Sequence, residues 1–371
     1  MRKAFISPSK YMQCAGALNY LGDYIKLYGK KAFLIAFKGD SERVAAALKN
    51  TQEKYKVSID IADFNGECSW NEINRLKAKV KESKYDVIIG LGGGKALDTA
   101  KCVANNLKPV IVCPTIAATD APTSSSAVVY HDDHTFDDYA YFTSNPNVVL
   151  VDTAVIAKAP VRFLVSGMGD ALATYFEARA CRRALARVNA SGFKKEKAVG
   201  TNAAFALAEL CYQTLLADGY KAYVACKEGK VTQAVENIIE NNILLSGLGF
   251  ESGGLAAAHA VYNGMTVIEE SEKFMHGEKV AFGTLVQLVL ENADDEEIND
   301  VLNFCLSVGL PVCLKDIGVD EITDDRLMEV AKKVCIPEES VHNMPFPVSP
   351  EDIVSAIRVA DRIGYSAKYE D

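Results

Sequence analysis

Short runs of consecutive apolar residues alternate with polar, amphipathic stretches over roughly the first 160 residues. Unbroken apolar runs are typical of strands covered on both faces, and the stretches between them have helical spacing. This alternation predicts a parallel sheet with crossover helices. The expected strands are residues 32–36, 57–61, 87–89, 110–112 and 148–151, and the expected helices between the first three include residues 42–49 and 71–81.

Two further patterns complete this prediction. Residues 128–136 have apolar side chains on either side of a polar centre, which indicates a hairpin beside the sheet. After Pro160 the chain changes to Ala- and Leu-rich segments with helical spacing, for example residues 203–216 and 231–245. We therefore expect an α/β domain with a Rossmann-like parallel sheet over residues 1–160 and an all-helical domain over residues 161–371, with the ligand site in the cleft between them.

Composition narrows the class of protein. A length of 371 residues suits two domains, and 49% hydrophobic with 24% charged residues matches ordinary globular proteins. The formal charge of -9 gives no electrostatic reason to bind nucleic acid or anionic lipid. The start is basic but has no apolar signal stretch, and no run is long enough to span a membrane, so we expect a cytoplasmic protein. Ten cysteines are scattered without a Cys-x-x-Cys pair, which predicts reduced, mostly buried thiols.

A glycine-rich turn, Gly90-Leu91-Gly92-Gly93-Gly94-Lys95, connects a predicted strand to a predicted helix. Glycines let backbone N–H groups approach phosphate oxygens, and the helix presents the positive end of its dipole, so this layout favours a diphosphate. The spacing differs from Gly-x-Gly-x-x-Gly and from a Walker loop, and Ala96 replaces the hydroxyl residue that would hold magnesium, which disfavours NTP hydrolysis. A purely structural turn is the alternative.

The segment of residues 114–126 follows another predicted strand and carries many hydroxyl groups with one acid, Asp120. Loops at the ends of parallel strands commonly bear binding residues, although Pro and Ser can also build a plain polar turn. Asp120 is the residue of this loop that we expect to bind a ligand.

Asp170, His259 and His276 form a candidate metal site, because one carboxylate and two imidazoles can bind a divalent ion and leave one coordination position open. Each has a simpler alternative: the histidines could be hydrogen-bonded core residues, and Asp170 could be a helix N-cap after Gly169. Asn263 lies four residues after His259 on an expected helix and could orient the site. The remaining histidines, His131, His134 and His342, lie in segments less suited to a metal site.

Five segments, taken in order along the chain, resemble the family of iron-containing and related metal-dependent alcohol dehydrogenases. They are residues 90–101, 114–122, 169–179, 249–259 and 276–283, and a weaker likeness continues to the carboxyl end, including residues 342–345. The resemblance implies a dehydroquinate synthase-like fold, in which the first domain binds NAD and the second binds metal and substrate. It also implies the reversible, NAD-dependent oxidation of glycerol to dihydroxyacetone, with hydride transferred from a zinc-bound polyol alkoxide to the nicotinamide. Relatives form homo-oligomers, so we expect an assembly between a dimer and an octamer.

Residue by residue, the resemblance assigns zinc to Asp170, His259 and His276, and substrate to Asp120, Asp170 and His259, so that these four residues make up the catalytic site. Iron-using relatives have a histidine four residues after the aspartate, whereas this chain has Thr174 there, which favours a three-ligand zinc site. The expected NAD contacts are Gly92, Gly93, Gly94, Lys95, Ala96, Leu97, Asp98, Thr115, Ile116, Ala117, Ala118, Ser124, Ser126 and Tyr130.

Three positions depart from the family pattern. Phe37 stands where NAD-preferring relatives often have an acid that binds the adenosine ribose, which leaves the choice between NAD and NADP open. Tyr262 replaces a common second histidine, and Ser126 replaces a leucine beside the cofactor.

The residues alone do not decide between this function and several alternatives. Propane-1,2-diol or butane-2,3-diol could replace glycerol as the substrate. A dehydroquinate-synthase-like lyase would require a cluster of Lys and Arg for its charged substrate, and the segments around Asp120, Asp170 and His259 carry little positive charge. A non-catalytic binding protein is disfavoured because Asp170, His259 and Lys95 are all present.

Overall fold

The computed structural model describes residues 1–188, 190 and 198–370. Its central sheet comprises β2 (Tyr11–Cys14), β3 (Lys31–Ala36), β4 (Ser58–Asp63), β5 (Val87–Gly92), β6 (Val110–Pro114) and β9 (Val148–Asp152). All six strands run parallel, in the order β2-β9-β6-β5-β3-β4. The five expected strands are confirmed. The edge strand β2 was not predicted, because its four residues mix polar and apolar side chains and give no clear period.

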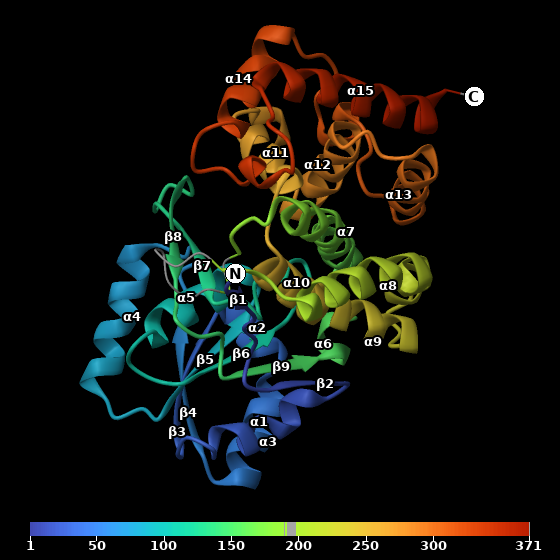
Figure 1. Ribbon diagram of the computed structural model, residues 1–371. Helices are drawn as coiled ribbons and strands as arrows, with labels where there is room; N and C mark the ends of the chain where they lie inside the picture. The colour runs from blue at the N-terminus through green and yellow to red at the C-terminus, as the bar shows by residue number, and fades with distance from the viewer. Residues whose placement is uncertain (189, 191–197, 371) are drawn as a thin grey trace.

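Helices cover both faces of this sheet (Figure 1). One face packs against α1 (Leu21–Ile25) and α3 (Ala45–Tyr55), and the other against α4 (Trp70–Glu82) and α5 (Gly94–Ala104). Successive residues of β3 point to opposite faces of the sheet. Leu34 packs in the apolar cluster that includes α1 and α3, and Ile35 packs in the cluster that includes α4 and α5. Two short helices, α2 (Lys38–Arg43) and α6 (Thr153–Ile156), follow directly after β3 and β9.

The predicted hairpin is confirmed as β7 (Ser126–Tyr130) and β8 (Phe136–Tyr141), which form a separate antiparallel pair against α5. A second small sheet pairs β1 (Lys3–Ala4) with β10 (Val199–Gly200). The otherwise helical second half therefore contains one two-residue strand, which is too short to leave a sequence pattern.

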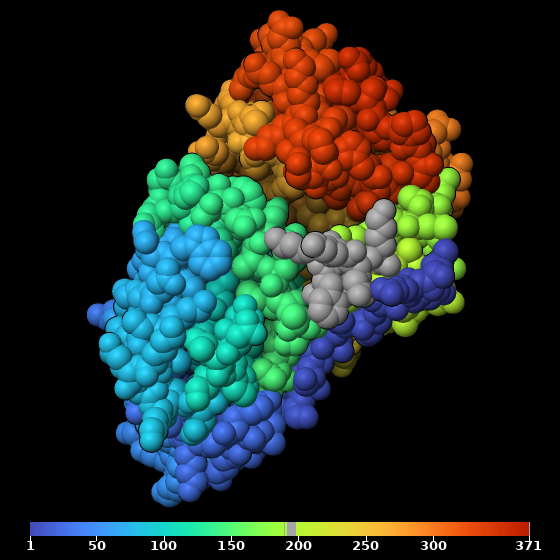
Figure 2. All heavy atoms as spheres, turned by 60° about the vertical axis from the view of Figure 1, so that its left-hand side comes forward, coloured from blue at the N-terminus to red at the C-terminus, as the bar shows by residue number. Residues whose placement is uncertain are grey.

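The orange and red segments of the remainder lie above the sheet in Figure 1 and form the upper part of the surface in Figure 2, whereas its yellow-green segments lie beside the sheet. Helices make up nearly all of this remainder. They are α7 (Val161–Ala184), α8 (Asn202–Lys227), α9 (Gln233–Glu240), α10 (Ser246–Gly253), α11 (Ala257–Met265), α12 (His276–Leu290), α13 (Asp295–Val308), α14 (Asp324–Val334) and α15 (Pro350–Tyr369). The expected helix over 203–216 lies within α8, whereas residues 231–245 divide into α9 and a π-helical segment, Asn241–Leu245. A domain boundary near residue 160, between β9 and α7, stays a prediction.

The long helix α7 is the centre of this helical part, where it packs against α8, α10, α11 and α12. It approaches α12 at backbone distance: a Cβ built on Gly277 would lie 1.8 Å from the carbonyl oxygen of Ser166, and one on Gly169 would lie 2.2 Å from that of Gly277. Only glycine permits this contact, which brings the start of α12 against the middle of α7.

Two expectations from composition can be compared with the structure. All ten cysteines are free thiols and most are buried, as expected. None of the helices in the described ranges is both long and apolar enough to cross a membrane.

Candidate metal centre and active site

Three helices bring the predicted metal ligands together. Asp170 projects from α7, His259 from α11 and His276 from α12, and one ligand atom from each lies within 4.8 Å of the others. The Nε2 atoms of His276 and His259 lie 2.9 and 3.3 Å from Oδ1 of Asp170. Among the described residues, this is the one group of three or more His, Cys, Asp or Glu side chains close enough to hold an ion. The donor set, one carboxylate and two imidazoles, fits a divalent metal.

Asp170 lies in the middle of α7, so the interpretation of this residue as an N-cap is wrong. The helix begins at Val161 with Pro160 as its N-cap, and Gly169, directly before Asp170, allows the close approach to α12 instead of starting a helix. The carboxyl group is buried, which by itself raises the pKa of Asp170, but the imidazoles of His276 and His259 outweigh burial and hold that pKa below its usual range. Asp170 is therefore a carboxylate.

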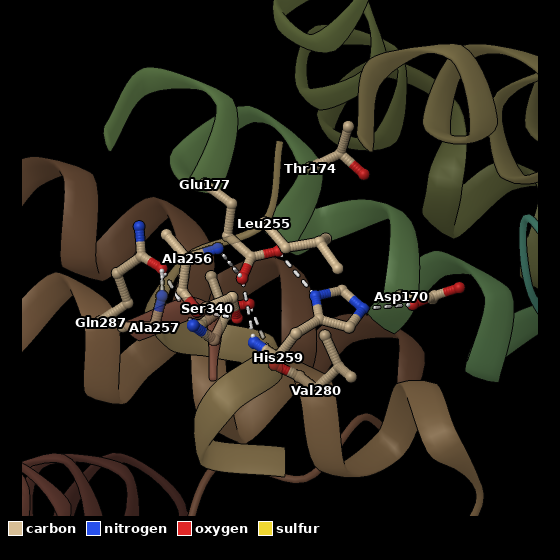
Figure 3. Close-up of polar contacts among 12 residues, drawn as sticks. Asp170, Thr174, Glu177, Leu255, Ala256, Ala257, His259, Val280, Gln287 and Ser340 are labelled. Carbon is tan, nitrogen blue, oxygen red and sulfur yellow. Dashed lines mark hydrogen bonds and ion pairs between the residues drawn. The ribbon is translucent and has the colours of Figure 1, made fainter. Parts of the chain in front are cut away.

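Glu177 orients His259, a role that the sequence interpretation missed. Its Oε2 lies 2.6 Å from Nδ1 of His259, and its Oε1 accepts hydrogen bonds from the backbone N–H groups of Ala256 and His259 at 2.8 and 3.0 Å. Figure 3 shows the imidazole held between Glu177 and Asp170. An Nδ1 proton donated to Glu177 would leave the Nε2 lone pair available to a metal ion in the ligand cluster.

A spacing signal for Glu177 was present, because it follows Asp170 by two helical turns and so shares its face of α7. Asn263, which the sequence suggested as the orienting residue, instead donates to the carboxylate of Glu339 at 3.0 and 3.2 Å. Within the described residues, the side-chain hydrogen bonds of Asn263 go to Glu339 and not to His259, so the structure does not support an orienting role for Asn263.

Replacing Glu177 with Gln is expected to weaken metal binding by about 10- to 100-fold, the usual effect of losing an acceptor behind a metal-binding histidine. The dissociation constant for zinc, measured by competition with a chromogenic chelator, checks this. Glu297→Gln is the matched control, because Glu297 pairs with Arg179 of the same helix and contacts neither imidazole. Equal zinc affinities for Glu177→Gln and the parent protein would contradict the role of Glu177.

Asp120 lies beside the cluster, in the loop between β6 and β7. Its backbone N–H donates to Oδ2 of Asp170 at 3.3 Å, and its own Oδ2 accepts from the Ser246 hydroxyl at 2.8 Å. Burial, followed by the charge of Asp170, raises the pKa of Asp120 well above its ordinary value. Ser246 in turn contacts the Thr174 hydroxyl at 3.0 Å, so Thr174 belongs to a hydrogen-bond chain that ends at Asp120 and offers no ligand nitrogen.

Lys101 and Glu251 anchor this loop from opposite sides. The buried ammonium of Lys101 lies 2.8 Å from Oδ1 of Asp98 and also donates to the carbonyl oxygens of Ala121 and Ser126. The carboxylate of Glu251 accepts from the backbone N–H and the hydroxyl of Ser125. Neither residue was singled out in the sequence, because their partners lie far away along the chain.

The glycine turn leaves the first turn of α5 available to an anion. Gly93 is the N-cap of α5 and provides no capping side chain, so the first N–H groups of the helix have no side-chain acceptor. A Cβ on Gly94 would lie at ordinary van der Waals distance from Thr119 and Ala121, 3.8 and 4.0 Å, so the turn faces the loop that carries Asp120. These features fit the diphosphate of a dinucleotide.

Lys95 stands beside the turn, with Nζ 2.6 Å from Oε2 of Glu67 and 4.8 Å from the centre of the Tyr130 ring. Glu67 also contacts Nδ1 of His134 at 2.6 Å. The hairpin residues Tyr130 and His134 thus lie next to the predicted phosphate-binding lysine.

The other predicted cofactor residues lie in two parts of the fold, the segment from the end of β6 to the start of β7 and the helix α5. Thr115, Ile116, Ala117, Ala118, Ser124 and Ser126 follow β6 or begin β7, on the same side as the turn. The side chains of Ala96, Leu97 and Asp98 are buried within α5, where Leu97 is in the core and Asp98 pairs with Lys101, so their proposed contacts with a cofactor are restricted to the backbone. Thr115, Ala117 and Ser124 are buried as well. Tyr262 packs edge-on against His276, with ring centroids 4.3 Å apart.

Comparison with known proteins identifies the family of this chain. A family model described as iron-containing alcohol dehydrogenase matches residues 8–153. Glycerol dehydrogenase of Citrobacter freundii is 50% identical over 365 residues, which cover 98% of each chain. The chain belongs to the iron-containing alcohol dehydrogenase family. Glycerol dehydrogenase of Thermotoga maritima is 48% identical over the same share of both chains. The solved structure of glycerol dehydrogenase from Schizosaccharomyces pombe has a TM-score of 0.93 at 38% identity and covers 98% of this chain and 91% of that one.

Membership of the iron-containing alcohol dehydrogenase family makes this protein an oxidoreductase of a metal-dependent class. The predicted fold, an α/β region with a parallel sheet followed by a helical region, is confirmed by both the structure and these neighbours.

Proposed function

We propose that this protein catalyses the reversible oxidation of glycerol to dihydroxyacetone, with NAD as the hydride acceptor and zinc held by Asp170, His259 and His276. The observation that carries the proposal is the meeting of this ligand cluster with Asp120, a partly buried carboxyl group at its side that can accept a hydrogen bond from a hydroxyl group. Glycerol dehydrogenases at close to half identity over the whole chain support the choice of substrate.

The ligand residues prepare a site with one accessible side. Asp170 is buried at the base, while the His259 and His276 side chains are 15% and 31% exposed, so the cluster is approached from the side of the imidazoles. Zinc bound there would act as a Lewis acid that makes a coordinated hydroxyl group more acidic. Thr174 in place of a fourth ligand supports zinc with three protein ligands.

Asp120 recognises a hydroxyl group of the polyol. The Ser246 hydroxyl fixes its Oδ2, and its backbone N–H is anchored on Asp170, so the carboxyl group stays beside the metal ligands. A carboxyl group in this place can accept a hydrogen bond from a second hydroxyl of the substrate, which favours vicinal diols over simple alcohols.

The glycine turn, Lys95 and the loop after β6 hold the dinucleotide. Backbone N–H groups of Gly93 and Gly94 receive the diphosphate at the start of α5, and the Lys95 ammonium neutralises its charge. Thr115 and Ser124 lie in the segment after β6, and Tyr130, at the end of β7, has its ring 4.8 Å from the Lys95 ammonium. NAD bound there supplies the acceptor for the hydride that leaves the carbinol carbon.

Formation of NADH from NAD and glycerol by the zinc-loaded protein tests this function. We expect a glycerol-dependent increase in absorbance at the NADH band, and a panel with propane-1,2-diol and butane-2,3-diol ranks the substrates by kcat/KM. A higher kcat/KM for either diol would replace glycerol as the substrate. Absence of NADH formation with every member of the panel would contradict the dehydrogenase function.

A further inference from the structure

The carboxylate of Asp40 lies directly against the glycine turn. Asp40 belongs to α2, which follows β3, and β3 is hydrogen-bonded to β5, the strand that leads into the turn. Its Oδ1 accepts from the Thr115 hydroxyl at 3.2 Å, and a Cβ on Gly92 would lie 3.2 Å from its Oδ2. One acidic group is therefore placed at the carboxyl ends of three neighbouring strands, β3, β5 and β6.

An acid in this position requires an explanation, because it would repel the diphosphate for which the turn is suited. Both polar contacts of Asp40, to Thr115 and to Arg43, are made by Oδ1. Within the described residues, no donor lies in hydrogen-bonding reach of Oδ2, and the side chain is 23% exposed. A carboxylate accepts hydrogen bonds only, so a ligand group that binds at Oδ2 has to present hydroxyl or N–H donors.

We infer that Asp40 binds the hydroxyl groups of the adenosine ribose and selects NAD over NADP. This inference rests on the proposed function, since it requires a nicotinamide dinucleotide on the glycine turn. A ribose attached to a diphosphate at the start of α5 offers two adjacent hydroxyl donors at the neighbouring strand, which matches the free oxygen of Asp40. The 2′-phosphate of NADP in the same place would lie beside the Asp40 carboxylate, and the two negative groups would repel each other.

Phe37 does not prevent this recognition. Its side chain is 53% exposed at the end of β3 and has no acceptor, but Asp40 lies one helical turn later and supplies the carboxylate. Selection for NAD therefore does not need an acid at position 37.

Arg43 gives the site a second property. Its Nη2 lies 2.7 Å from Oδ1 of Asp40, so the guanidinium is occupied by the carboxylate while Asp40 is present. Guanidinium groups also bind phosphate well, in a planar two-point geometry. Removing the carboxylate would free Arg43 beside the position of the 2′-phosphate.

Direct binding of NADH and NADPH, followed by the fluorescence of the reduced nicotinamide, tests the inference without turnover. We expect Asp40→Ala to bind NADH about tenfold more weakly, which is the effect of losing a hydrogen bond to a charged group. The same variant should bind NADPH more tightly by a similar factor. The double variant Asp40→Ala/Arg43→Ala should lose the gain for NADPH. Because a misfolded variant cannot gain affinity, the NADPH result separates recognition from stability.

Glu42→Gln is the control, since Glu42 lies on the same helix and pairs only with Lys38, at 3.9 Å. An unchanged ratio of NADH to NADPH affinity in Asp40→Ala would overturn the inference. A parent protein that binds neither nucleotide would overturn both the cofactor proposal and this one. A parent protein that binds NADH but does not oxidise glycerol would refute the substrate alone, and the binding ratio would still decide the role of Asp40.

Discussion

Replacing His259 with Ala is expected to lower kcat/KM for glycerol by at least about 1000-fold, since Lewis-acid stabilisation contributes several kcal/mol and each 1.4 kcal/mol is a factor of ten. His259 is one of three side chains whose ligand atoms meet within 4.8 Å, and Glu177 holds its ring in one orientation. Steady-state kinetics with NAD, combined with the zinc content of the purified variant, measures the loss.

His342→Ala is the control for this experiment. The Nε2 of His342 contacts the carbonyl oxygen of Ile336, and the side chain lies outside the cluster. We expect this variant to keep the parent zinc content and activity. A His259→Ala protein that retains zinc and more than a tenth of the parent kcat/KM would contradict the assignment of His259 as a ligand.

Replacing Lys101 with Met is expected to lower the free energy of unfolding by about 3–5 kcal/mol, because removing one partner of a buried ion pair leaves the other charge uncompensated. The Lys101 and Asp98 side chains are 2% and 8% exposed, and the ammonium also donates to the carbonyl oxygens of Ala121, Ser124 and Ser126, in and at the end of the loop that carries Asp120. Burial raises the pKa of Asp98, and Lys101 opposes that rise. Urea unfolding followed by circular dichroism gives the difference in stability.

The double variant Asp98→Leu/Lys101→Met separates the charge from the packing. It also removes the Asp98 carboxylate, which Lys101→Met alone would leave buried and unpaired, so we expect the double variant to be more stable than Lys101→Met. If the free energy of unfolding of Lys101→Met lies within about 1 kcal/mol of that of the parent protein, the buried ion pair contributes little to stability.

The periodic part of the fold could be predicted from sequence. The central strands have unbroken apolar runs because helices cover both faces of the sheet, as the two clusters around Leu34 and Ile35 show. The hairpin over residues 126–141 was visible for a similar reason, since apolar residues flank a polar turn. By contrast, β2, β1 and β10 have two to four residues each and are held by pairing, which no local period reveals.

The three candidate ligands could be picked out from the sequence, whereas the residues that contact and support them could not. Asp170, His259 and His276 are chemically conspicuous, whereas Glu177 is a single glutamate in a long helix and Lys101 is one of many lysines. Their roles depend on burial and on partners more than twenty residues away in the chain, such as Ser126 and His259. Asp170 was placed wrongly at a helix start because glycine is common at helix ends, and here it serves close packing between α7 and α12. A cytoplasmic location and homo-oligomerisation stay predictions.

NADH formation from NAD and glycerol, measured before chelation, after chelation and after zinc is added back, tests the central claim most directly. We expect the glycerol-dependent rate to fall to background when metal is removed and to return when zinc is restored. A rate that persists in protein shown by elemental analysis to be free of metal would contradict a metal centre at Asp170, His259 and His276. Recovery with iron and not with zinc would contradict the choice of metal.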